Sequence, residues 1–99
     1  MAEDVCTVIV AYEVNAEDEQ RFKNAWKKAQ DFLKKQEGLS STTLYKAASA
    51  NPQFRFVNIA RWESADHFRT ATQSVGFHEA SGSLAPYPVY ASVYEVAES

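Results

Sequence analysis

The chain lacks several residues and patterns on which common types of site depend. Its one cysteine, Cys6, excludes an internal disulfide and favours a reducing, cytoplasmic location. With three glycines it has no phosphate-cradling loop and no dinucleotide-binding fingerprint, and no G-x-S-x-G motif marks a nucleophilic serine. The net charge of −3 provides no basic surface for nucleic acid. No apolar run is long enough to span a membrane, and the acidic residues 1–4 do not resemble a secretory signal.

Metal-binding and nucleophilic sites are also poorly represented. His67 and His78 are eleven residues apart, and no neighbouring cysteine or histidine completes a ligand set. We therefore expect two partly exposed helix histidines and no bound metal. Cys6 falls within an apolar strand, where a thiol is usually inert. Redox-active side chains are lacking, so an oxidation would depend on the substrate or on a bound cofactor.

What the chain does contain is a succession of strands and helices in a single domain. Hydrophobic residues make up 45% and aromatic residues 13% of residues 1–99, enough for one packed core. Asn15 is expected to cap the first helix, Gly38 to end it, and Ser64 to cap a second helical region that breaks near residues 74–76. The expected strands are Val5–Val14, Leu39–Ser49, Phe54–Trp62 and Val89–Val96.

The order β-α-β-β-α-β predicts an α+β, ferredoxin-like fold, in which two helices cover one face of a four-stranded sheet. Right-handed crossovers lead us to expect the first and third strands as parallel neighbours at the centre of the sheet. Both strands are also apolar on their second face, and an exposed apolar patch of this kind usually marks an interface. We therefore expect a homodimer that packs sheet to sheet.

The third predicted strand carries the most informative pattern. Side chains two residues apart share one face of a strand, so Asn58 and Trp62 point the same way as Phe54, Phe56 and Ala60. A buried asparagine is costly unless its amide finds hydrogen-bond partners. Either a neighbouring main chain or a bound ligand would provide them.

Two interpretations of this surface stay open. In the first, Asn58 bonds to a neighbouring main chain within a plain hydrophobic core. In the second, a ligand pocket lies between the third strand and the second helix. Its expected lining is aromatic apart from Asn58 and consists of Tyr45, Phe56, Trp62, Phe68, Phe77 and Tyr87.

From Phe56 to Ser64 (FVNIARWES) the chain resembles the antibiotic biosynthesis monooxygenase family of the dimeric α+β barrel superfamily. The resemblance covers nearly the whole chain and includes Trp26 and the segment Gly38–Ser41. It implies a ferredoxin-like dimer with one such domain over residues 1–99. Family members that oxidise anthrones and related phenols work without metal, flavin or haem. In them the equivalents of Asn58 and Trp62 hold the substrate's oxygens while the substrate itself reacts with O₂.

A few positions depart from the patterns of these relatives. Phe68 and Leu44 stand where the anthrone-oxidising members carry tyrosines, and Gly82 aligns approximately with an arginine. Haem-degrading members end a Phe-x-Glu-Ala-His string with the histidine that ligates iron. Here the corresponding string runs from Phe77 to Ser81 and ends in serine.

The resemblance leads to the hypothesis of a cofactor-independent monooxygenase that acts with O₂ on an electron-rich aromatic or enolisable small molecule. Asn58 and Trp62 would hydrogen-bond the reacting oxygens, and His78 or Tyr45 would accept the proton. Further substrate contacts are expected from Tyr45, Phe54, Phe56, Phe68 and Phe77. The alternatives are a non-catalytic dimer that binds a hydrophobic small molecule and a haem-binding protein that uses His78.

Overall fold

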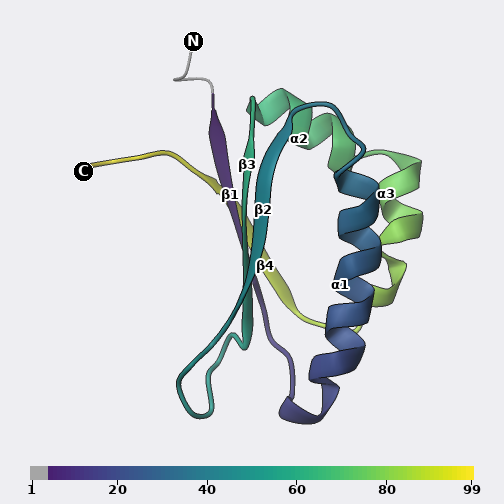
Figure 1. Ribbon diagram of the computed structural model, residues 1–99, viewed down its shortest axis with the longest axis vertical. Helices are drawn as coiled ribbons and strands as arrows, with labels where there is room; N and C mark the ends of the chain where they lie inside the picture. The colour runs from purple at the N-terminus through teal and green to yellow at the C-terminus, as the bar shows by residue number, and fades with distance from the viewer. Residues whose placement is uncertain (1–4) are drawn as a thin grey trace.

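A computed structural model describes residues 5–99 of the chain, so the acidic residues 1–4 and the expectation drawn from them lie outside the described part. One four-stranded sheet carries all the helices on one of its faces (Figure 1). This is the predicted ferredoxin-like α+β fold. The elements are β1 (Cys6–Tyr12), η2 (Ala16–Asp18), α1 (Glu19–Leu33), β2 (Leu39–Lys46), β3 (Phe56–Trp62), α2 (Ala65–Thr72), α3 (Val75–Ala80), η3 (Gly82–Leu84) and β4 (Val89–Tyr94).

The sheet has the strand order β2-β3-β1-β4, and all neighbouring strands are antiparallel. The expectation that the first and third strands are parallel neighbours is therefore wrong. The α1 crossover leads from β1 to β2, which run in the same direction, and the hairpin that follows then turns β3 back between them. In this register Asn58 lies between Val10 of β1 and Leu44 of β2.

Local signals explain where the elements begin and end. The side chain of Ser64 accepts a hydrogen bond from the backbone N–H of His67 at the start of α2, as predicted. Ser74 accepts one from Phe77 at the start of α3, which accounts for the predicted break in the second helical region. Asn15 differs from expectation, because it precedes the short η2 turn and its side chain forms no capping bond.

The strands β2 and β3 are shorter than predicted, because their hairpin widens into a loop between residues 46 and 56. A backbone bond from Ala47 to the carbonyl of Arg55 closes this loop, and Asn51 adopts a left-handed conformation with φ 51°. The side chain of Arg55 donates to the Val14 carbonyl at 2.8 Å and lies 3.4 Å from the Glu19 carboxylate. These contacts tie the base of the loop to the start of α1.

The core consists of two clusters of buried side chains between the sheet and the helices. The first contains Trp62, which is 1% exposed, and the second is built around Phe22, which is fully buried. Phe22 stacks on Phe56 with ring centroids 4.7 Å apart and meets the edges of Tyr12 and Tyr87. Each aromatic pair contributes about 0.5–1.5 kcal/mol beyond the area that it buries.

The helices are held close to one another and to the sheet by two glycines. Gly38 has φ +98°, and a Cβ added there would overlap the ring of His67 on α2. Gly76 brings α3 so close to α1 that an added Cβ would lie 2.5 Å from the ring of Phe32. Glycine is therefore required at both positions, at the first for its backbone conformation and at both for space.

No helix within residues 5–99 covers the second face of the sheet (Figure 1). The central strands present half-buried Ile9, Val57 and Ile59 on this face. Around them Tyr45 and Tyr90 are each 54% exposed, so the face is apolar with an aromatic margin. We refer to it as the open face. None of the helices in the described part of the chain has the length and apolar character needed to cross a membrane.

Replacing Gly38 with alanine should lower the free energy of unfolding by about 1–3 kcal/mol, because the new Cβ meets His67 in a left-handed backbone conformation. Urea denaturation measures this change. Gly82→Ala is the matched control, since an added Cβ there has no neighbour within 4 Å. Equal stability of the two variants would contradict this account of Gly38.

Alkaline pH should destabilise the fold through Tyr12. Burial raises the pKa of Tyr12 from 10.0 to about 12, so the unfolded chain loses this proton at lower pH than the folded protein. The resulting stabilisation is complete below pH 10 and is lost as pH rises through about 12. Unfolding free energies measured across this range should fall less steeply in Tyr12→Phe than in wild type, and equal slopes would contradict this role of Tyr12.

Candidate functional site

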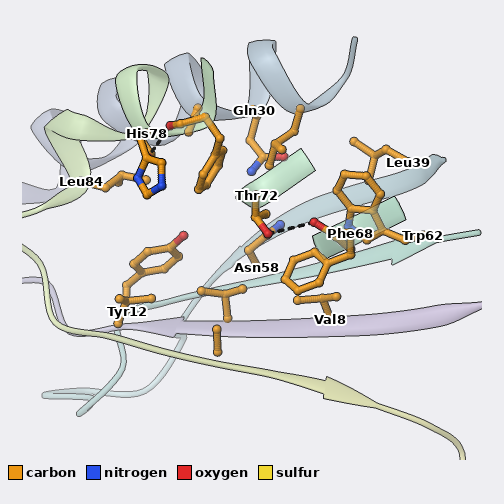
Figure 2. A pocket seen from close by; sticks show the side chains of 18 of the residues that line it. Val8, Tyr12, Gln30, Leu39, Asn58, Trp62, Phe68, Thr72, His78 and Leu84 are labelled. Carbon is orange, nitrogen blue, oxygen red and sulfur yellow. Dashed lines mark hydrogen bonds between the residues drawn. The ribbon is translucent and has the colours of Figure 1, made fainter. Parts of the chain in front are cut away.

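A cavity of about 510 Å³ lies between the helix-covered face of the sheet and the helices α1, α2, α3 and η3 (Figure 2). Members of both core clusters line it, and most of its wall is aliphatic or aromatic. Its volume is within the range of sites that enclose small organic molecules. The polar side chains in its wall therefore decide what it can recognise. They are Tyr12, Gln30, Asn58, Trp62, Thr72, His78 and Ser81.

Asn58 reaches the cavity because the alternation of β3 turns its side chain toward the helices, where it is 4% exposed. Its Nδ2 donates one hydrogen bond to Thr42 Oγ1 and another to the backbone carbonyl of Thr43, both 2.9 Å long. Both N–H groups of the amide are therefore engaged. Because the Thr43 carbonyl is only an acceptor, it fixes which end of the amide faces β2.

The hydrogen-bond chain continues from Thr42 to α1. Thr42 Oγ1 lies 3.0 Å from Gln30 Oε1 and donates to it, since the same hydroxyl accepts from Asn58. Gln30 is 5% exposed on the side of α1 that faces the sheet. Figure 2 shows its side chain extending from α1 toward Asn58. The bridging Thr42 hydroxyl thus joins two buried amides that belong to different elements.

Three polar atoms in this wall form no hydrogen bond among residues 5–99: Asn58 Oδ1, Gln30 Nε2 and Trp62 Nε1. They are not sealed within the core, because in the described part of the chain only Trp26 Nε1 is both buried and unpaired. Since the three residues are otherwise nearly fully buried and all line the cavity, we infer that their free atoms face it. The wall therefore offers two donors and one acceptor to a ligand.

A second polar group lies at the other end of the cavity. The Tyr12 hydroxyl points toward the His78 ring on α3 (Figure 2). Because burial raises the pKa of Tyr12 to about 12, its hydroxyl stays protonated near neutral pH and can donate a hydrogen bond. His78 is solvent-exposed as well as lining the cavity, so it can exchange protons with water.

The structure brings five of the predicted site residues together in the wall of this cavity: Asn58, Trp62, Phe68, Phe77 and His78. Phe68 meets the edge of Trp62 with ring centroids 5.8 Å apart, and Phe77 packs 6.4 Å from Phe32. Trp62, Phe68 and Phe77 thus form an aromatic part of the cavity wall between α2, α3 and the sheet.

The other four predicted residues do not line this cavity. Phe56 and Tyr87 pack around Phe22 in the second core cluster. Tyr45 is 54% exposed on the open face, because it is adjacent to Leu44 in β2 and so points the opposite way. Phe54 precedes β3, where strand alternation no longer applies, and its ring packs against Tyr90.

The sequence interpretation missed Gln30, Thr42 and Tyr12. A signal for Gln30 was present, because it lies four residues after Trp26 and eight after Phe22, at helical spacing on the apolar face of α1. A polar residue on such a face requires a partner, as Asn58 does. Thr42 offered no comparable signal, since nothing local shows which side chain lies across the β2–β3 pair.

No group of three or more histidine, cysteine, aspartate or glutamate side chains within residues 5–99 is arranged to hold a metal ion. Burial raises the pKa of the Cys6 thiol, which keeps it in its unreactive protonated form.

Comparison with solved structures shows the same fold in several proteins. A proposed monooxygenase from Shewanella loihica PV-4 is 24% identical, with a TM-score of 0.85 and 96% of each chain covered. SnoaB, a cofactor-independent oxygenase from Streptomyces nogalater, is 22% identical, with a TM-score of 0.83 over 97% of this chain and 96% of its own. A dimeric protein of unknown function and ferredoxin-like fold from Bacteroides fragilis NCTC 9343 is 14% identical, with a TM-score of 0.76 over 97% of this chain and 100% of its own.

No curated protein matches the chain. The sequence model of one family does match, over residues 6–82, and its description is antibiotic biosynthesis monooxygenase. The matched range runs from the start of β1 to η3 and contains every polar residue of the cavity wall. The chain belongs to the antibiotic biosynthesis monooxygenase family.

Proposed function

We propose that the protein is a cofactor-independent monooxygenase that acts on an electron-rich aromatic or enolisable small molecule. Membership of the family supports a monooxygenase-type function, and the structurally similar SnoaB is a cofactor-independent oxygenase. The observation that carries the proposal is the cavity itself. Its apolar walls suit an aromatic molecule, and its unpaired polar atoms can hold that molecule's oxygens in one orientation.

The proposed reaction takes its electrons from the substrate. Removal of a proton from an activated CH₂ group leaves a carbanion stabilised as an enolate or phenolate. This carbanion gives an electron pair to O₂ and forms a C–O bond, and protonation yields a hydroperoxide. Loss of water then leaves a carbonyl, so that CH₂ and O₂ become C=O and H₂O. The contribution of the protein is to stabilise the oxyanion and to exclude bulk water.

Three polar residues of the wall have proposed roles in this reaction. Trp62 Nε1–H is a neutral donor in a nearly dry wall, which suits a developing oxyanion. Asn58 has both N–H groups engaged, so its Oδ1 would accept a hydrogen bond from a substrate hydroxyl. This differs from the donor role expected from the sequence. His78 would accept the proton, because it is the one imidazole among the residues that line the cavity.

A homodimer packed through the open face completes the proposal. The exposed apolar surface of Tyr45, Tyr90 and Tyr94 surrounds the half-buried centre of the sheet, and such a face is usually covered in solution. The similar protein from Bacteroides fragilis is dimeric. In this arrangement the cavity of each copy lies on the far side of its sheet from the interface.

A non-catalytic protein that binds a hydrophobic small molecule is the second candidate. It is favoured by the internal hydrogen bonds of the Asn58 nitrogen, which hold this amide in place without a reacting substrate. The haem alternative, which would use His78, is favoured by no observation of this kind.

Oxygen uptake by metal-stripped protein tests the catalytic role. With a panel of anthrones, dihydroxynaphthalenes and hydroquinones, Asn58→Ala should lower turnover by at least about tenfold, because the substrate hydroxyl loses its acceptor. Asn24→Ala, at an exposed asparagine of α1, is the matched control and should retain wild-type turnover. Binding of a panel member without O₂ uptake would select the binding protein instead.

The dimer is tested by light scattering at micromolar concentration. Wild type should show twice the mass of the chain. Ile59→Lys places a charge at the centre of the open face and should shift the protein to the monomer, whereas Asn24→Lys on the exposed side of α1 should not. A wild-type monomer would refute the predicted interface.

A further inference from the structure

We propose that Gln30 is a ligand-contacting specificity residue. Thr42 is a positioning residue, because its hydroxyl bonds the oxygen of the Gln30 amide and the nitrogen of the Asn58 amide. The cavity wall then presents one donor, Gln30 Nε2, beside one acceptor, Asn58 Oδ1. The ligand selected by this pair carries an acceptor oxygen and a hydroxyl on the same edge. The inference rests on the proposed binding of an aromatic molecule in the cavity.

The Thr43 carbonyl fixes the orientation of Asn58, and the hydrogen bond from Thr42 fixes that of Gln30. The Thr43 carbonyl lies 2.9 Å from Asn58 Nδ2, and a carbonyl cannot donate, so the nitrogen end of Asn58 must face β2. The same nitrogen donates to Thr42 Oγ1 at 2.9 Å. The Thr42 hydroxyl therefore directs its own hydrogen to Gln30, and only the oxygen of that amide can accept it.

These hydrogen bonds leave one polar atom of each amide without a partner. With its oxygen bonded to Thr42, Gln30 turns Nε2 away, and with its nitrogen bonded to β2, Asn58 turns Oδ1 away. Neither atom is paired among the described residues or sealed from the cavity. Rotating the Asn58 amide by half a turn would set its oxygen against the Thr43 carbonyl, and rotating the Gln30 amide would remove the acceptor of the Thr42 hydroxyl.

Burial makes this pattern selective. Gln30 and Asn58 are 5% and 4% exposed, so water reaches them mainly through the cavity that a ligand would fill. A ligand without an oxygen opposite Gln30 would leave a desolvated N–H group unpaired, and one without a hydroxyl would leave Asn58 Oδ1 unpaired. The site therefore distinguishes molecules of the same shape by their polar groups.

Three probes that share one fused-ring skeleton test the pattern. The first is a hydroxytetralone whose hydroxyl and carbonyl lie on the same edge without bonding to each other. The second is tetralone, which lacks the hydroxyl, and the third is tetrahydronaphthol, which lacks the carbonyl. Titration calorimetry should show that wild type binds the hydroxytetralone at least about fivefold more tightly than either of the others, the worth of one neutral hydrogen bond.

The variants assign each preference to a residue. Gln30→Met keeps the length of the side chain and should abolish the preference over tetrahydronaphthol while leaving the preference over tetralone. Thr42→Val removes the bridge and should weaken both preferences, whereas Thr42→Ser retains the hydroxyl and should restore them. Thr70→Val is the control, because Thr70 is an exposed threonine of α2 that does not line the cavity. Thermal unfolding checks that each variant is folded.

Several results would overturn the inference. These are failure of wild type to bind the hydroxytetralone, equal affinity for all three probes, or an unchanged carbonyl preference in Gln30→Met. If Gln30→Met does not fold, loss of preference in Thr42→Val without rescue in Thr42→Ser would also overturn it. Because binding is measured without turnover, O₂ uptake with no carbonyl preference would refute the role of Gln30 alone. The expected preferences without O₂ uptake would refute the monooxygenase and not the role of Gln30.

Discussion

The burial of one amide at the centre of the sheet is the constraint on which the candidate site depends. Asn58 lies between β1 and β2 at a position that most folds fill with an apolar side chain, and its nitrogen is held by Thr42 and Thr43. An unpaired buried amide would cost more than a hydrogen bond returns. The hydrogen bonds that satisfy this amide therefore link β2, β3 and α1, and they also determine which polar atoms of the cavity wall stay unpaired.

The sequence predicted the fold and the break in the second helical region, because these depend on local patterns. Ser64 and Ser74 are helix caps whose partners lie three residues away, and the periodicity of α1 and the strands is visible within each segment. The orientation of β3 relative to β1 was predicted wrongly. This orientation depends on the hairpin placing β3 between β2 and β1, and no single segment of the sequence contains that information.

The site was predicted in part for the same reason. Asn58, Trp62, Phe68 and Phe77 line the cavity, since alternation and helical spacing determine which way they point. Phe54 and Tyr45 do not, because one precedes its strand and the other lies one residue out of phase. Thr42 could not have been identified, as its role exists only once β2 lies beside β3 and beneath α1. The Asn58 nitrogen bonds to a neighbouring main chain, as the first interpretation expected, and a ligand contact of its oxygen stays a prediction of the second.

The close approach at Gly76 has a consequence for how molecules reach the cavity. With α3 in contact with the Phe32 ring, the helix that carries Phe77 and His78 has no free space in which to slide along α1. The opposite wall contains Val89 and Ala91 of β4, an edge strand whose residues are all exposed. Passage into the cavity is thus easier beside β4 than between the helices. A wall of fixed shape would favour recognition by fit, with little reorganisation to offset the affinity for a ligand.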